Sequence, residues 1–147
     1  MNGLQSKPHH SRQGFFVPGC AEGRHYGTAT RPLPGHREVL VVCRASAKIE
    51  AHPVYTWPVS TGRNGFRTPT GSYRVQRMER TYRSRKYKLP MPYSLFYQGG
   101  YAIHGTDATA MLGRPASHGC VHLSPSNART LFRKVQKHGG ARIIVAR

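Results

Sequence analysis

A cysteine and two histidines lie within one short stretch of this 147-residue chain. Cys120 follows His118 by two residues, and His104 comes directly after the apolar run 101–103, which is typical of a strand. A cysteine thiol is only slightly ionised near neutral pH, so a nucleophilic cysteine needs a neighbouring base or a lowered pKa. A histidine can provide either. We therefore predict an active site within residues 101–124, with Cys120 as the nucleophile and His104 as its base.

Glycines flank these reactive residues, since Gly105 follows His104 and Gly119 precedes Cys120. Glycine permits unusual backbone angles and lets backbone amides approach an oxyanion closely. In an extended segment the side chains of His118 and Cys120 would share a face, so His118 could line the same pocket without being the base.

The order of these residues resembles the signature of a known family. His104-Gly105-Thr106, followed after ten residues by Ser117-His118-Gly119-Cys120, is similar to the L,D-transpeptidase catalytic domain, also called the YkuD-type domain, of bacterial peptidoglycan metabolism. The stretches 58–62, 68–71 and 91–94 resemble the lead-in of that family at the expected spacing. The resemblance covers residues 54–147.

The resemblance implies a reaction and a role for each motif residue. Cys120 would attack an L-to-D peptide bond of a peptidoglycan stem, with His104 as base, and pass the acyl group to an amine or to water. The carbonyl of Gly105 would orient the imidazole, while His118, Gly119 and Ser117 would shape the oxyanion and substrate site. The further substrate contacts that we expect are Tyr93, Thr106, His122, Arg83 and Arg85.

One motif position departs from the family, because His122 stands where arginine or asparagine is more common. The resemblance also implies peptidoglycan stem peptides as partners, no cofactor, and a place in the periplasm or cell envelope. No signal peptide is visible, because the apolar run 14–18 is too short for one, and no apolar run approaches the 18 residues of a membrane span.

Other functions fit parts of the sequence. His104, His118, Cys120 and His122 are all plausible zinc ligands, but no paired Cys-x-x-Cys or His-x-x-x-His spacing accompanies them, so we expect no metal. The basic and aromatic stretch 79–88 would suit a nucleic-acid-binding module, which explains the charge but not the cysteine motif. We expect no specific nucleic acid as partner. An inactive cell-wall-binding domain is a further alternative.

Composition sets the outline of the protein. Lys and Arg number 23 against 5 Asp and Glu, a net charge of +18 that attracts any polyanion at low salt. The three cysteines leave at least one thiol free in an exported protein; Cys20 and Cys43 could pair or remain thiols. The chain suits one domain, and we expect a monomer.

The 16 glycines and 11 prolines favour many turns and a mainly β architecture. We expect a single L,D-transpeptidase-like β-sandwich domain over residues 38–147, preceded by a disordered N-terminal segment, 1–37. One short α-helix is predicted at 124–138, capped by Ser124 and with an apolar face of Ala128, Leu131, Phe132 and Val135. Short antiparallel strands are predicted at 38–44, 54–60 (with Pro58 at an edge or bulge), 72–78, 91–97, 100–103 and 141–146.

Overall fold

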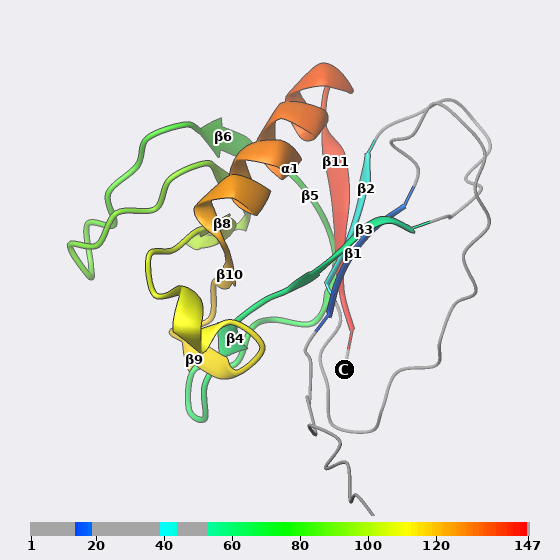
Figure 1. Ribbon diagram of the computed structural model, residues 1–147. Helices are drawn as coiled ribbons and strands as arrows, with labels where there is room; N and C mark the ends of the chain where they lie inside the picture. The colour runs from blue at the N-terminus through cyan, green and yellow to red at the C-terminus, as the bar shows by residue number, and fades with distance from the viewer. Residues whose placement is uncertain (1–13, 19–38, 44–52, 147) are drawn as a thin grey trace, which may run out of the picture.

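The computed structural model describes residues 14–18, 39–43 and 53–146, which form two main β-sheets and one α-helix (Figure 1). The helix α1 spans Pro125–Lys137 and the short 3-10 helix η1 spans Thr109–Met111. The strands are β1 Gly14–Pro18, β2 Val39–Cys43, β3 Pro53–Pro58, β4 Thr61–Gly62, β5 Gly71–Arg74, β6 Arg77–Glu79, β7 Ser94–Gln98, β8 Tyr101–Gly105, β9 Pro115–Ser117, β10 Val121–Leu123 and β11 Ala141–Val145.

The larger sheet has five strands in the order β3-β1-β2-β11-β5. Strand β1 lies antiparallel to β3 and parallel to β2, and β11 joins β2 to β5 through antiparallel pairs on both sides. Pro58 ends the edge strand β3, where its missing N–H costs no ladder bond, as the sequence predicted.

The smaller sheet has four strands in the order β10-β8-β7-β6 and carries the cysteine motif. Strand β10 follows Cys120 directly and runs parallel to β8, so that His122 pairs with His104 and Leu123 with Gly105. A separate two-stranded piece joins β4 to β9, the strand that ends at Ser117. Residues that lie 18 positions apart in the sequence therefore become neighbours across one pair of strands.

The helix forms as its sequence predicts. The Ser124 hydroxyl accepts a hydrogen bond from the N–H of Asn127 at 3.3 Å, and Pro125 occupies the first turn, where no intrahelical N–H bond is lost. Its buried face consists of the four predicted residues Ala128, Leu131, Phe132 and Val135. This face packs over β7, β8 and β10 (Figure 1).

The main core lies between the two sheets and the helix. It joins Ile143 and Val145 of β11 to Leu95 and Tyr97 of β7, together with the helix face, and Trp57 packs against it. Burial of this apolar area stabilises the fold by roughly 25 cal/mol per Å². The helix is thereby fixed behind the strands that carry the cysteine motif.

The structure confirms a mainly β sandwich with one helix and corrects several strands. The segment predicted as disordered, 1–37, contains β1, whose backbone completes the five-stranded sheet; residues 1–13 and 19–37 lie outside the described ones. The strand predicted at 72–78 is two strands in different sheets. The chain crosses between sheets where the N–H of Val75 donates to Ala141 O and that of Gln76 donates to Phe96 O. Three of the strand pairs are parallel, not antiparallel.

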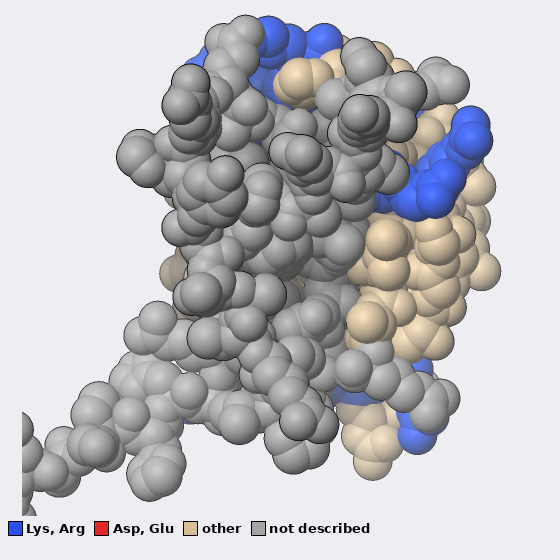
Figure 2. Space-filling view, turned by 90° about the vertical axis from the view of Figure 1, so that its right-hand side faces the viewer, with Lys and Arg blue, Asp and Glu red and all other residues tan. Residues whose placement is uncertain are grey.

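Charge is strongly one-sided over the part of the chain that the structure describes. Its only acidic residues are Glu79, which pairs with Arg77 at 3.3 Å, and Asp107. Figure 2 shows Lys and Arg side chains at separate places around one face, with uncharged residues between them. No helix in this part of the chain is long and apolar enough to cross a bilayer.

Candidate active site

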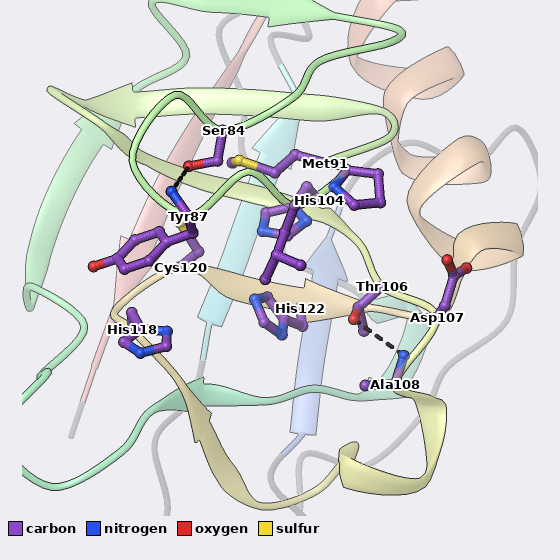
Figure 3. A pocket seen from close by; sticks show the side chains of 12 residues that line it. Ser84, Tyr87, Met91, His104, Thr106, Asp107, Ala108, His118, Cys120 and His122 are labelled. Atoms are coloured by element: carbon purple, nitrogen blue, oxygen red, sulfur yellow. Dashed lines mark hydrogen bonds between the residues drawn. The ribbon is translucent and has the colours of Figure 1, made fainter.

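A pocket of about 250 Å³ opens beside β8 and β10, and the loop between β6 and β7 covers it (Figure 3). The strands contribute His104 and His122, and the bend before β10 contributes His118 and Cys120 to the same wall. The opposite wall is mostly apolar and comes from the covering loop, through Tyr87, Leu89, Pro90 and Met91. The cysteine and the three motif histidines thus share one small cavity.

His104 is held in one tautomer. It lies on β8 with 5% of its surface exposed, and its Nδ1 donates to the carbonyl oxygen of Gly105 at 2.7 Å. A carbonyl oxygen can only accept, so Nδ1 carries the proton and Nε2 remains an acceptor. Burial lowers the pKa of His104 to about 4, against the opposing effect of the Gly105 bond. The imidazole is therefore neutral near pH 7 and able to take a proton at Nε2.

Cys120 is a free thiol that lies directly before β10. Its Sγ lies 3.9 Å from the carbonyl oxygen of Gly100. Burial raises the pKa of the thiol, although a hydrogen bond from the backbone of Ala102 works in the opposite direction. The resting thiol is accordingly protonated, and proton removal must accompany any nucleophilic attack.

A tight loop sets the direction of Cys120. The N–H of Gly119 donates to Ser117 Oγ at 3.0 Å, and that hydroxyl in turn donates to the Cys120 carbonyl. Gly119 has φ +110°, and a Cβ there would meet Cε1 of Tyr101 at 2.5 Å, so the position needs glycine. Because Ser117 engages its N–H, Gly119 itself does not have a free amide to offer an oxyanion.

His118 contacts three side chains at the pocket rim. Its ring stacks on Tyr87, with centroids 4.5 Å apart, and meets Phe66 edge-on at 4.8 Å. Its Nε2 lies 2.8 Å from Nη2 of Arg63, whose guanidinium is the donor. Partial burial, then the charges of Arg63 and Lys86, lower the pKa of His118. His118 therefore links the covering loop to the cysteine motif.

His122 faces His104, with ring centroids 4.6 Å apart. Burial, followed by the charges of His104 and His118, lowers its pKa to about 3. Thr106 also lines the pocket, and its Oγ1 accepts from the N–H of Ala108 at 3.2 Å. Both residues were predicted as substrate contacts, and both line the pocket.

The other three predicted contacts do not line the pocket. Tyr93 has φ +56°, which turns its ring onto Phe132, with centroids 5.8 Å apart. Arg83 and Arg85 are exposed on the covering loop. Gly105, Ser117 and Gly119 are not among the residues that line the cavity; Gly105 accepts the hydrogen bond of His104, and Ser117 accepts that of the Gly119 N–H.

Sequence reasoning missed the apolar part of the covering loop. Leu89, with 59% of its surface exposed, Met91 and Ser84 all line the pocket. The signal for Leu89 and Met91 is the apolar run 89–91, which directly follows a strongly basic stretch. Among residues 53–146, no three His, Cys, Asp or Glu side chains are grouped as a metal ion would require.

The chain is similar in fold to several solved L,D-transpeptidase structures. The chain is similar to an L,D-transpeptidase from Mycobacterium smegmatis (26% identity, TM-score 0.53, covering 58% of this chain and 46% of that one). It is similar to an L,D-transpeptidase from Stackebrandtia nassauensis (32% identity, TM-score 0.50, covering 62% of this chain and 43% of that one). It is also similar to one from Mycobacterium tuberculosis H37Rv (29% identity, TM-score 0.51, covering 58% of this chain and 46% of that one). The matched part spans less than half the length of each of these chains. The comparison with curated proteins gave no match.

A family model extends the similarity beyond the residues that carried the resemblance. The model of the L,D-transpeptidase catalytic domain, YkuD, matches residues 37–145, which begin before β2 and end in β11. This range holds the pocket and both sheets apart from β1. The chain belongs to the L,D-transpeptidase catalytic domain family.

Proposed function

We propose that this domain is a cysteine acyltransferase that acts on peptidoglycan stem peptides outside the cytoplasmic membrane. Cys120 is the nucleophile and His104 the base. The observation that carries the proposal is the bond from His104 Nδ1 to Gly105, because it leaves Nε2 as an acceptor in the same cavity as the free thiol of Cys120. Family membership supports the choice of substrate.

The first half of the reaction breaks the L-to-D peptide bond. His104 Nε2 takes the thiol proton as Sγ attacks the carbonyl carbon, and the proton then passes to the departing amine. The N–H of Cys120 is the proposed donor to the oxyanion, since Gly119 already donates to Ser117. The product is a thioester on Cys120 and a released D-amino acid.

The second half transfers the acyl group to an acceptor. An amine attacks the thioester carbonyl, a C–N bond forms, the C–S bond breaks, and the thiol recovers a proton. An amine of a second stem gives a cross-link, an amine of a protein gives attachment, and water gives the carboxypeptidase reaction. The apolar loop wall limits access of water to the thioester.

The test is acylation by a carbapenem, followed by measurement of the intact mass. One of the similar structures is an L,D-transpeptidase in complex with imipenem, so imipenem is the probe. We expect the mass of one acyl adduct on the wild-type chain and none on Cys120→Ala with an unchanged circular dichroism spectrum. Without imipenem, the wild-type chain should convert a stem tetrapeptide and release its terminal D-alanine. An adduct on folded Cys120→Ala would exclude Cys120 as the nucleophile.

A further inference from the structure

The pocket contains two histidines, His118 at its rim and His122, that the thiol chemistry does not use. His104 has a single acceptor nitrogen, Nε2, because Nδ1 is committed to Gly105. His122 lies against it on the neighbouring parallel strand, with the ring centroids 4.6 Å apart. Figure 3 shows the two rings next to each other in the middle of the cavity.

The nitrogens of His122 are open to the cavity. Among the residues that the structure describes, no side chain or backbone group forms a hydrogen bond with its imidazole. The Tyr97 hydroxyl is the only buried polar side-chain atom of this set without a partner, so the His122 nitrogens retain access to the pocket. Within the described part of the chain, no hydrogen bond fixes the tautomer of His122, whereas the bond to Gly105 fixes that of His104. Such a ring can accept a proton at one nitrogen and donate one from the other.

The charged and titratable groups near His122 are few. His104 and Cys120 share its cavity, His118 lies at the rim with Arg63 and Lys86 beyond it, and Asp107 is the one acid in the pocket wall. Burial, followed by the neighbouring His104 and His118, lowers the pKa of His122 to about 3. The ring is therefore neutral at physiological pH and has an acceptor nitrogen available.

We propose that His122 is a second catalytic base, which takes the proton from the amine that attacks the Cys120 thioester. The proposal rests on the acyltransferase function above and assigns a base to its second half, the transfer of the acyl group to an amine. As the amine nitrogen bonds to the thioester carbon, one N–H proton moves to His122. The C–S bond then breaks, Cys120 leaves as a thiolate, and the proton returns to the sulfur through the adjacent His104. Thioester and amine become amide and thiol, with no other reactant.

The alternative is that His122 only packs against His104. Two variants separate these roles: His122→Asn keeps polarity but loses the titratable ring, and His122→Phe keeps a ring against His104 but has no nitrogen. A base is absent from both, whereas packing is retained in His122→Phe.

The experiment measures the two halves with one acyl donor, the S-phenyl thioester of N-acetyl-L-lysine, and one acceptor, glycinamide. Thiophenol release is measured as the burst of the first turnover and reports acylation, and the ratio of amide to acid reports the second half. Folded Cys120→Ala gives the uncatalysed background. In both His122 variants we expect near-normal thiophenol release and amide formation lower by about 10²-fold, the lower end for general base catalysis.

Each other result has a clear meaning. Wild-type amide formation in folded His122→Asn or His122→Phe would overturn the proposal, as would a parallel fall of thiophenol release and amide in a folded variant. Circular dichroism establishes folding, and either variant alone decides if the other does not fold. A wild-type chain that neither releases thiophenol nor forms an imipenem adduct would refute the proposed function itself. That outcome differs from normal acylation with an unchanged ratio of amide to acid in the His122 variants, which would refute only the role of His122.

Discussion

Tyr87 stacks on His118, with ring centroids 4.5 Å apart and planes inclined by 23°. Tyr87 belongs to the loop between β6 and β7, whereas His118 lies two residues from the reactive thiol. The stack, together with the hydrogen bond from Arg63 to His118, connects the covering loop to the wall of the pocket that contains Cys120. The width of the pocket therefore depends on this aromatic pair.

Loss of the ring at position 87 should open the pocket. Aromatic pairs contribute about 0.5–1.5 kcal/mol beyond the area that they bury. In Tyr87→Ala we expect a higher KM for stem tetrapeptide and faster alkylation of Cys120 by iodoacetamide. Tyr87→Phe keeps the stack and serves as the matched control. Unchanged KM and alkylation in Tyr87→Ala would mean that the stack does not hold the loop.

His104 should matter far more than any other histidine for acylation. Replacement by glutamine removes the acceptor Nε2, and general base catalysis is worth about 10²–10⁴-fold. We expect His104→Gln to lower the rate of imipenem acylation by that amount, while His122→Gln has a small effect on this step. His138→Gln, beyond the end of α1, is the control. Equal losses at positions 104 and 122 would show that the base is wrongly assigned.

Much of this site could be predicted because its signals are local. The apolar spacing and the Ser124 cap determine α1, and the sequence HGT…SHGC places His104 and Cys120 in one motif. Both signals depend on residues close together in the chain, where periodicity and turn chemistry are informative.

The rest depends on pairings between distant segments. The parallel register of β8 and β10 brings His122 to His104, and the crossing at Val75 and Gln76 divides one apparent strand between two sheets. The left-handed backbone of Tyr93 turns its ring toward Phe132. None of these follows from residue pattern, because the partners lie far apart in the chain and tertiary packing decides the outcome.

Acid should destabilise the folded domain through its buried histidines. The pKa of His104 falls from 6.5 to about 4 on folding, so the unfolded chain binds more protons between these values. Stability therefore is complete above about pH 6.5 and decreases as the pH falls toward 4, by roughly 3 kcal/mol for this group. His122 adds to the same trend. Urea unfolding at several pH values should show it.

A double variant tests the source of that pH dependence. His104→Gln combined with His122→Asn removes both depressed pKa values, so the fall in unfolding free energy between neutral and acid pH should become shallower. The same steep fall in the double variant would assign the acid sensitivity to other groups.

Gly119 should tolerate no side chain. In Gly119→Ala the new Cβ would lie 2.5 Å from Cε1 of Tyr101, and φ +110° is strained for any L-residue. Backbone strain of this kind costs about 1–3 kcal/mol. We expect a lower midpoint of thermal unfolding and slow acylation of Cys120. Tyr101→Leu in the same chain removes the ring contact but not the strain, so it should restore only part of the loss. Full restoration would show that the backbone angle is unimportant.

The exposed basic side chains of the covering loop should bind peptidoglycan and should not assist acylation of Cys120. Arg83 and Arg85 lie outside the pocket, and Lys86 lies over the ring of Tyr87 at 5.3 Å. Neutralising all three with glutamine should weaken binding to isolated sacculi and make it less dependent on salt, because surface charges are screened over about 10 Å at 0.1 M salt. Acylation by imipenem should remain near normal.

A matched triple variant on α1 separates the position of these charges from their number. Arg129→Gln, Arg133→Gln and Lys137→Gln remove the same charge from exposed helix positions, and we expect sacculus binding to fall less. Equal loss of sacculus binding in both triple variants would mean that the domain is attracted to the cell wall by its net charge alone. Oligonucleotides test the nucleic-acid alternative: we expect only weak binding at about 0.15 M salt. Micromolar binding that the loop variant abolishes, and that competes with acylation of Cys120, would assign the loop to nucleic acid instead.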